Sequence, residues 1–228
     1  VDNGLSAGFQ PKINFIAEDL SAATEEIVVL LKRKQWGGDI IKEWREKLFA
    51  ELFKNAFMPA SVFRSIQKIV PDTSLVLDTG LFCTIGETVW QASGSENFLG
   101  SSVGRFMGTA IPTAIGFSIS APEKRVVCAV GDGGVRPYFP ELKIAAERNL
   151  PILFLLMSDG GYGSVAMSGK QKGLSKNAFE IKESSWWRVA EAIGIESQEV
   201  ANIGEFEKAM ERWQKNKKPM FLEMHFDQ

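Results

Sequence analysis

Two aspartates, Asp132 and Asp159, each stand in a glycine-rich turn and lie 27 positions apart in the chain. The first turn is Gly131-Asp132-Gly133-Gly134, and the second is Ser158-Asp159-Gly160-Gly161-Tyr162-Gly163. Carboxylate oxygens are ligands that hard divalent cations prefer, and glycines let the backbone come close to phosphate oxygens. The two turns together therefore suit a divalent cation that carries a diphosphate.

Each turn follows an apolar run typical of a strand that is buried on both faces, Val126 to Val130 and Ile152 to Met157. Between the runs the pattern predicts one crossover helix, with Pro140 in its first turn and Asn149-Leu150-Pro151 at its end. The order of strand, turn, helix and strand places both turns at the carboxyl edge of one parallel sheet. Open α/β sheets bind their ligands at that edge.

The two turns resemble the signature of the thiamine-diphosphate-dependent enzymes, specifically of the acetolactate synthase and pyruvate decarboxylase group. That signature is Gly-Asp-Gly followed, after a gap of similar length, by Asn in a turn. Met107 to Gly116 also looks like the family's Met-Gly and Pro-Ala-Ala-Ile-Gly helix, and Leu75 to Gly80 resembles the strand and turn that open its diphosphate-binding domain. The resemblance implies an α/β fold, a doubly wound parallel sheet with helices on both faces.

Carried over residue by residue, the resemblance implies that the cofactors are thiamine diphosphate and Mg²⁺. Asp132 and Asp159 would bind the metal through their side chains and Gly161 through its backbone carbonyl, while Met107 would support the cofactor in its bent conformation. The full set of cofactor-binding residues implied in this way is Thr79, Gly80, Met107, Gly131, Asp132, Gly133, Gly134, Asp159, Gly161, Tyr162 and Gly163.

The sequence departs from the family pattern at two places. Position 159 is Asp where the family has Asn, which adds a negative charge to a site that must also hold a polyanion. Nearby groups could offset this charge, and the hydroxyl of Ser164 and the positive Lys170 and Lys172 are candidates by their proximity in sequence. The second departure is Leu81-Phe82-Cys83, where relatives often place Gln or His near the phosphates.

Composition is that of a soluble globular chain of 228 residues, with 45% hydrophobic residues, 24% charged residues and a net charge of -2. No basic surplus argues for nucleic acid, and no apolar segment is long enough for a membrane helix. The N-terminus lacks the pattern of a signal peptide, so a cytoplasmic location is expected. The two cysteines, Cys83 and Cys128, suggest neither a disulfide framework nor a metal cluster, and Cys128 is expected to lie in the core.

Residues 1-58 are expected to be a remnant of the family's middle domain plus a linker helix, and residues 59-228 the diphosphate-binding domain. A strand at Ile13 to Ile16 and a helix with an apolar stripe through Leu31 are predicted first. An amphipathic segment, Asp39 to Met58, follows; a linker helix packed on the main domain is favoured over a partner-binding helix. The stretch from Gly163 to Glu183 is expected to form a flap over the cofactor.

Three further elements are predicted near the C-terminus, two helices and a final strand, over Trp186 to Ile193, Gly204 to Asn216 and Met220 to Phe226. The single histidine, His225, lies in the final strand and is expected to be structural and remote from both glycine turns. Trp186 and Trp187 could line a substrate channel, but helix packing explains them equally well.

Nothing in this chain resembles the family's pyrimidine-binding domain, whose glutamate activates the cofactor. The chain is therefore expected to supply half of an active site and no catalytic side chain of its own. We expect a hetero-oligomer with a partner that carries the pyrimidine domain and the catalytic Glu. A natural subunit of a split enzyme is favoured over a fragment of a longer chain.

The preferred hypothesis is a lyase or transferase that decarboxylates a 2-oxo acid, with the cofactor as electron sink. The acyl-anion equivalent that results would be transferred to a second carbonyl. One alternative is the small subunit of a 2-oxoacid:ferredoxin oxidoreductase, whose iron-sulfur clusters two scattered cysteines cannot supply. The other is a noncatalytic cofactor-binding or regulatory module in which Asp159 disables the metal site.

Overall fold

The computed structural model describes residues 19-30, 37-55, 57-100, 104, 106-181 and 185-226. The chain divides into two compact units, Val1-Lys47 and Leu48-Gln228, which are described separately. The predicted strand at Ile13 to Ile16 falls outside the described residues. The boundary predicted at residues 58 and 59 stays a prediction.

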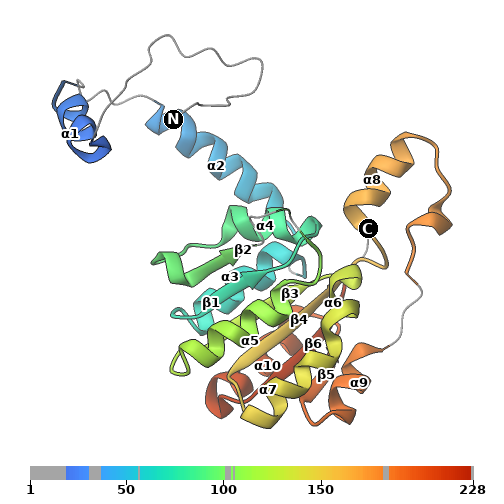
Figure 1. The fold of residues 1–228 in the computed structure, drawn as a ribbon. Helices are drawn as coiled ribbons and strands as arrows, with labels where there is room; N and C mark the ends of the chain where they lie inside the picture. The colour runs from blue at the N-terminus through green and yellow to red at the C-terminus, as the bar shows by residue number, and fades with distance from the viewer. Residues whose placement is uncertain are drawn as a thin grey trace. The chain divides into compact units, whose positions relative to one another are not determined.

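The second unit is built on one sheet of six parallel strands (Figure 1). In spatial order the strands are β2 (Phe98-Gly100), β1 (Ser74-Leu77), β3 (Val126-Val130), β4 (Ile152-Ser158), β6 (Met220-His225) and β5 (Glu196-Val200). Because every pair is parallel, the connections must cross over the sheet, and helices cover both of its faces. The predicted doubly wound α/β fold is confirmed.

The core lies on the two faces of this sheet, and β3 shows how the sequence divides it. All five residues of β3 are buried. Val127 and Ala129 belong to one hydrophobic cluster, whereas Val126, Cys128 and Val130 belong to the other. Successive side chains of a strand point to opposite faces, so a continuous apolar run fills both layers at once. The expectation that Cys128 is a core residue is confirmed.

Each cluster is completed by its own helices. The first cluster packs α3 (Pro59-Ile69), α4 (Leu81-Val89) and α10 (Ile203-Asn216) against the sheet. The second packs α5 (Ala110-Ser120), α7 (Leu142-Arg148) and α9 (Trp186-Ala192). The predicted elements at 186-193, 204-216 and 220-226 appear as α9, α10 and β6.

The crossover between the two aspartate turns differs from the single helix that was predicted. It consists of α6 (Asp132-Tyr138), the 3-10 turn η2 (Phe139-Glu141) and α7. Pro137 and Pro140 explain the interruption, because proline lacks the amide that a continuous helix needs. Asn149 ends α7 in the left-handed conformation, as the predicted helix end requires.

The first unit contains α1 (Leu20-Leu30), and α2 (Gly38-Leu52) runs across the boundary into the second unit. No residue of α2 is buried. At its end, Phe49 and Leu52 pack as partly buried side chains against the first cluster. The last turn of α2 therefore belongs to the main domain, and the role of the rest as linker or partner-binding helix stays a prediction.

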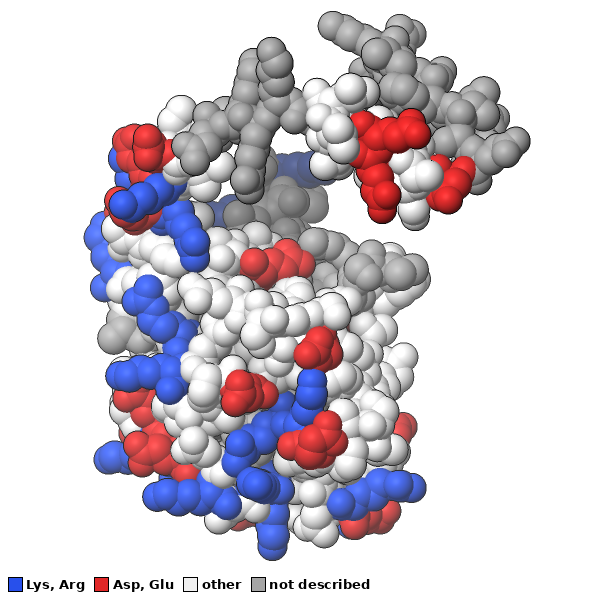
Figure 2. Space-filling view, turned by 90° about the vertical axis from the view of Figure 1, so that its left-hand side faces the viewer, with Lys and Arg blue, Asp and Glu red and all other residues white. Residues whose placement is uncertain are grey.

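Charged side chains of both signs lie close together in the lower half of the face shown in Figure 2. Among the described residues, that part of the surface has no extended area of one sign. None of the helices in the described ranges has both the length and the apolar composition needed to cross a bilayer.

Candidate functional site

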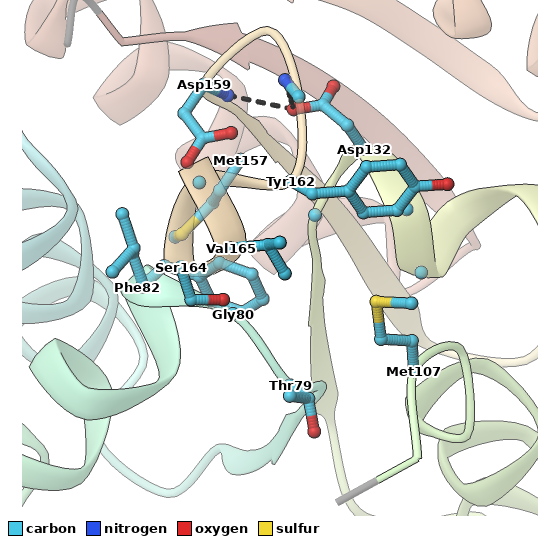
Figure 3. A pocket seen from close by; sticks show the side chains of 16 residues that line it. Thr79, Gly80, Phe82, Met107, Asp132, Met157, Asp159, Tyr162, Ser164 and Val165 are labelled. Atoms are coloured by element: carbon cyan, nitrogen blue, oxygen red, sulfur yellow. Dashed lines mark hydrogen bonds between the residues drawn. The ribbon is translucent and has the colours of Figure 1, made fainter. Parts of the chain in front are cut away.

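The two aspartate turns meet at the carboxyl edge of the sheet. β3 and β4 are paired in register with Val130 opposite Leu156, so the residues that follow each strand lie side by side. One carboxylate oxygen of Asp132, Oδ2, accepts hydrogen bonds from the backbone amides of Asp159 at 2.9 Å and Gly161 at 3.3 Å (Figure 3). Asp132 thus fixes the backbone of the second turn.

Asp159 has an unfavourable environment for a charged carboxylate in the ligand-free chain. Partial burial raises its pKa from 3.8 to about 6, and the negative charge of Asp132 adds to the effect. Two carboxylates that repel each other in one pocket form a site that a cation would stabilise. Among the described residues no cluster of three or more His, Cys, Asp or Glu side chains is arranged for a metal. A cation here would therefore rely on the two carboxylates, backbone carbonyl oxygen and ligand phosphates.

The second turn is closed by a segment that returns from α8 (Gly163-Gln171) and the 3-10 turn η3 (Lys176-Ala178). Gly161 forms an antiparallel bridge with Glu180, and the Tyr162 amide donates to the Phe179 carbonyl at 2.9 Å. A Cβ at Gly161 would run into that same carbonyl oxygen. Glycine is needed at this position so that the two segments can approach.

All eleven residues expected to bind the cofactor line one pocket. They come from the ends of the three neighbouring strands β1, β3 and β4, and from the turn before α5 (Figure 3). Five further residues line the pocket that were not among those expected to bind the cofactor, namely Leu81, Phe82, Met157, Ser164 and Val165. Leu81 and Phe82 could have been found, because they directly follow Gly80 and stand where relatives often have polar residues.

Met107 and Tyr162 flank the first glycine turn. A Cβ at Gly133 would lie 2.6 Å from the Tyr162 ring and 3.2 Å from the Met107 sulfur. The absence of a side chain at Gly133 therefore lets a thioether and an aromatic ring pack against the backbone of the first turn. The role of Met107 in supporting the bent cofactor stays a prediction.

The two lysines named as candidates to offset the charge of Asp159 lie outside this pocket. Lys170 lines a neighbouring apolar hollow beside Leu81 and Phe179, and Lys172 is exposed. Of the three groups named as candidates to offset Asp159, Ser164 lines the pocket itself. Arg136, which sequence reasoning missed, lines a wider open hollow that shares Met107, Gly133 and Tyr162 with the pocket.

His225 lies nearer to the site than predicted. It is paired with Ser158 in the sheet, directly before Asp159, so the expectation that it is remote from both glycine turns is wrong. The parallel pairing of β4 with β6 brings it there, which the sequence alone does not specify. Its imidazole lies 3.2 Å from Glu223 and does not belong to the pocket lining, so a structural role is retained.

The two tryptophans of α9 pack against the second cluster. The Trp186 ring stacks on Phe139 with centroids 4.8 Å apart, and neither Trp186 nor Trp187 lines the pocket. Helix packing, one of the two roles considered for them, accounts for this position.

Comparison with known families decides which group of proteins the fold and the pocket represent. The model of the family described as "Thiamine pyrophosphate enzyme, C-terminal TPP binding domain" matches residues 78-224, more than half of the chain. The chain belongs to the thiamine pyrophosphate enzymes. The matched region begins at the end of β1 and includes every residue of the pocket. The resemblance drawn from the sequence is therefore confirmed.

Individual relatives agree with this assignment. The catabolic acetolactate synthase of Raoultella terrigena is 30% identical over 159 residues, which cover 67% of this chain and 28% of that protein. The acetolactate synthase large subunit of Buchnera aphidicola subsp. Schlechtendalia chinensis is 26% identical over 128 residues, 55% of this chain and 22% of that protein. The chain thus spans less than a third of either relative.

A solved structure shows the same fold. The thiamine diphosphate-dependent 4-hydroxybenzoylformate decarboxylase of Rhodococcus jostii RHA1 superposes with a TM-score of 0.68 at 19% identity. The superposition covers 74% of this chain and 32% of that one.

Replacing Asp159 by Asn is expected to stabilise the ligand-free chain at neutral pH. The folded chain holds the Asp159 proton more tightly than the unfolded chain, so the wild type loses stability as pH rises from about 4 to about 6. After allowance for solvent screening of this partly exposed group, Asp159→Asn should gain about 1 kcal/mol at pH 7.5 and nothing at about pH 4. Urea denaturation of both proteins without divalent cations measures this difference. An equal or lower stability of Asp159→Asn at pH 7.5 would contradict the electrostatic account of the pair.

Proposed function

We propose that this chain binds the diphosphate of thiamine diphosphate together with Mg²⁺, as one subunit of an acetolactate synthase-like 2-oxo acid decarboxylase or carboligase. The observation that carries the proposal is the meeting of Asp132 and Asp159 in one glycine-lined pocket. That pocket lies in the domain that matches the family's TPP-binding model.

The residues present fit the metal and the cofactor. Asp132 and Asp159 would hold Mg²⁺ through carboxylate oxygen and Gly161 through its carbonyl. A bound cation would offset the burial and the charge of Asp132, which together raise the pKa of Asp159. The backbone at Gly131, Gly133 and the neighbouring Gly134 lines the pocket and would face the phosphates. When bound, thiamine diphosphate supplies the electron sink for decarboxylation.

The protein's own contribution is to bind and orient. Asp132 orders the second turn through two backbone amides, and Met107 and Tyr162 form walls on either side of Gly133. Phe82 and Val165 add apolar surface that would reduce the access of water. No side chain of this pocket needs to act as a nucleophile.

We further propose that a partner completes the site with a pyrimidine-binding domain and the glutamate that activates the cofactor. Two observations support this. One similar acetolactate synthase is named as a large subunit, a name that implies a further subunit in that enzyme. Met107 and Tyr138 are partly exposed beside an open hollow next to the cofactor pocket, where a second domain could pack.

A noncatalytic cofactor-binding or regulatory module is the second candidate. Asp159 favours it, because a carboxylate in place of the family's amide adds negative charge beside the diphosphate. The two candidates differ in whether a complex containing this chain turns over a 2-oxo acid.

Calorimetric titration of the full chain tests cofactor binding. Thiamine diphosphate with Mg²⁺ is expected to bind, and Asp132→Ala is expected to weaken binding at least about 100-fold, because it removes a metal ligand and the acceptor that orders the second turn. Asp72→Ala is the matched control, since Asp72 is exposed just before β1, at the opposite edge of the sheet. Binding that Asp132→Ala leaves intact would rule out the proposed metal site.

The same titration with Asp159→Asn shows what the additional charge does. We expect Mg²⁺ alone to bind more weakly to Asp159→Asn than to the wild type, because one anionic ligand is replaced by a neutral one. Tighter binding of thiamine diphosphate by Asp159→Asn would show that the additional charge is a handicap for the diphosphate.

Turnover should require the partner. The isolated chain is expected to release no CO₂ from a 2-oxo acid, and addition of a polypeptide with the pyrimidine domain and its glutamate is expected to restore release. The complex made with Asp132→Ala is the control and should stay inactive. Turnover by the isolated chain would overturn the half-site proposal, and an inactive but cofactor-loaded complex would favour the noncatalytic module.

A further inference from the structure

A fully buried carboxylate, Asp78, stands at the end of β1, outside the set of residues that line the cofactor pocket. Its backbone amide continues the pairing of β1 with β3 by donating to the Ala129 carbonyl at 3.0 Å. Its side chain accepts a hydrogen bond from the Gly108 amide, which lies 2.8 Å from each carboxylate oxygen. The amides of Thr79 and Ala110 also favour its charged form.

These contacts connect Asp78 to the turn that carries Met107. Gly108 follows Met107 directly, is buried, and has a φ of +88°, a conformation that L side chains rarely adopt. Ala110 is the first residue of α5. One carboxylate therefore holds both the residue after Met107 and the start of the helix that follows.

Asp78 also contacts the first glycine turn. A Cβ at Gly134 would collide with Oδ2 of Asp78, and a Cβ at Gly108 would lie 3.0 Å from the Gly134 carbonyl oxygen. Glycine at position 134 is thus required by the buried carboxylate beside it. The end of β1, the Met107 turn and the first glycine turn pack together around this single side chain.

The chemistry of the group explains why an acid stands here. A carboxylate is an acceptor on both oxygens, and its known partners at this place are backbone N-H groups. An amide of the same shape would turn an NH₂ group toward one of these donors and leave a buried N-H without its acceptor. Burial opposes the charge by raising the pKa of Asp78, and the amides oppose that shift.

We propose that Asp78 is a positioning residue, which fixes the Met107 turn against the first glycine turn and so keeps Met107 in the cofactor pocket. The effect on cofactor binding rests on the proposed function. The effect on the turn itself does not, because it follows from contacts within the chain.

The competing explanation is that Asp78 only stabilises the domain, as any satisfied buried acid does. Glu223 provides the matched comparison. It is also buried in the sheet, with 2% of its surface exposed, and it accepts a backbone amide, that of Trp187, at 2.8 Å. Glu223 does not line the cofactor pocket.

Hydrogen exchange on the full chain without cofactor separates the two explanations. In Asp78→Asn the amides of residues 106-110 should lose protection by about tenfold or more, while those of β4 keep theirs. In Glu223→Gln residues 106-110 should stay protected, and the loss should appear at the start of α9. Unchanged protection of 106-110 in Asp78→Asn, or an equal loss there in Glu223→Gln, would overturn the proposal.

A second variant covers the case in which Asp78→Asn does not fold. Gly134→Ala pushes a methyl group against the same carboxylate. It should loosen residues 106-110 in the same way. Protection of 106-110 that Gly134→Ala leaves intact would count against the proposal as directly as the first variant.

Measurements of cofactor binding then show whether Asp78 affects the cofactor site by positioning Met107. Asp78→Asn should weaken thiamine diphosphate binding about tenfold, and Glu223→Gln should leave it within about twofold of the wild type. In the background of Met107→Ala, Asp78→Asn should have a much smaller effect, because the side chain that it positions is gone. Equal effects in both backgrounds would contradict action through Met107. If the wild type bound no cofactor, the proposed function would fail while the exchange result still decided the role of Asp78.

Discussion

The hydrogen bonds from the amides of Asp159 and Gly161 to one oxygen of Asp132 hold the site together. They join the ends of β3 and β4, two strands that are far more hydrophobic than the residues that follow them. The parallel pairing of these two strands brings the turns side by side. The carboxylate of Asp132 then fixes the backbone of the second turn. The metal ligands proposed on the second turn, Asp159 and Gly161, are therefore held in place by these hydrogen bonds before a metal binds.

Several glycines around the pocket are explained by neighbouring groups that occupy the space a Cβ would fill. Gly134 makes space for the Asp78 carboxylate, Gly163 for that of Asp159, and Gly161 for the Phe179 carbonyl. A glycine-rich motif is often interpreted only as a surface for phosphate. In this chain the same glycines also allow two acidic side chains and a returning segment to approach the backbone, so phosphate access and internal packing constrain the same positions.

How much the sequence predicts depends on whether a feature is local. The strands at 126-130 and 152-157 and the turns after them were predictable from consecutive residues. A continuous apolar run indicates a strand that is buried on both faces, and the glycines after it indicate a turn. The interruption of the crossover helix was foreseeable in part from Pro137 and Pro140. The contact of Asp78 with Gly108 and the pairing of His225 with Ser158 were not, since both depend on which strands lie next to each other.

As proposed, Asp132 and Asp159 hold a divalent cation that carries the diphosphate. A crystal structure of the full chain with thiamine diphosphate and Mg²⁺ tests it most directly. We expect the cation to lie between the two carboxylates and the Gly161 carbonyl, with each metal-oxygen distance about 2.1 Å and with phosphate oxygen completing the coordination shell. A cofactor bound with its diphosphate away from these turns, or a cation that ignores Asp159, would contradict it.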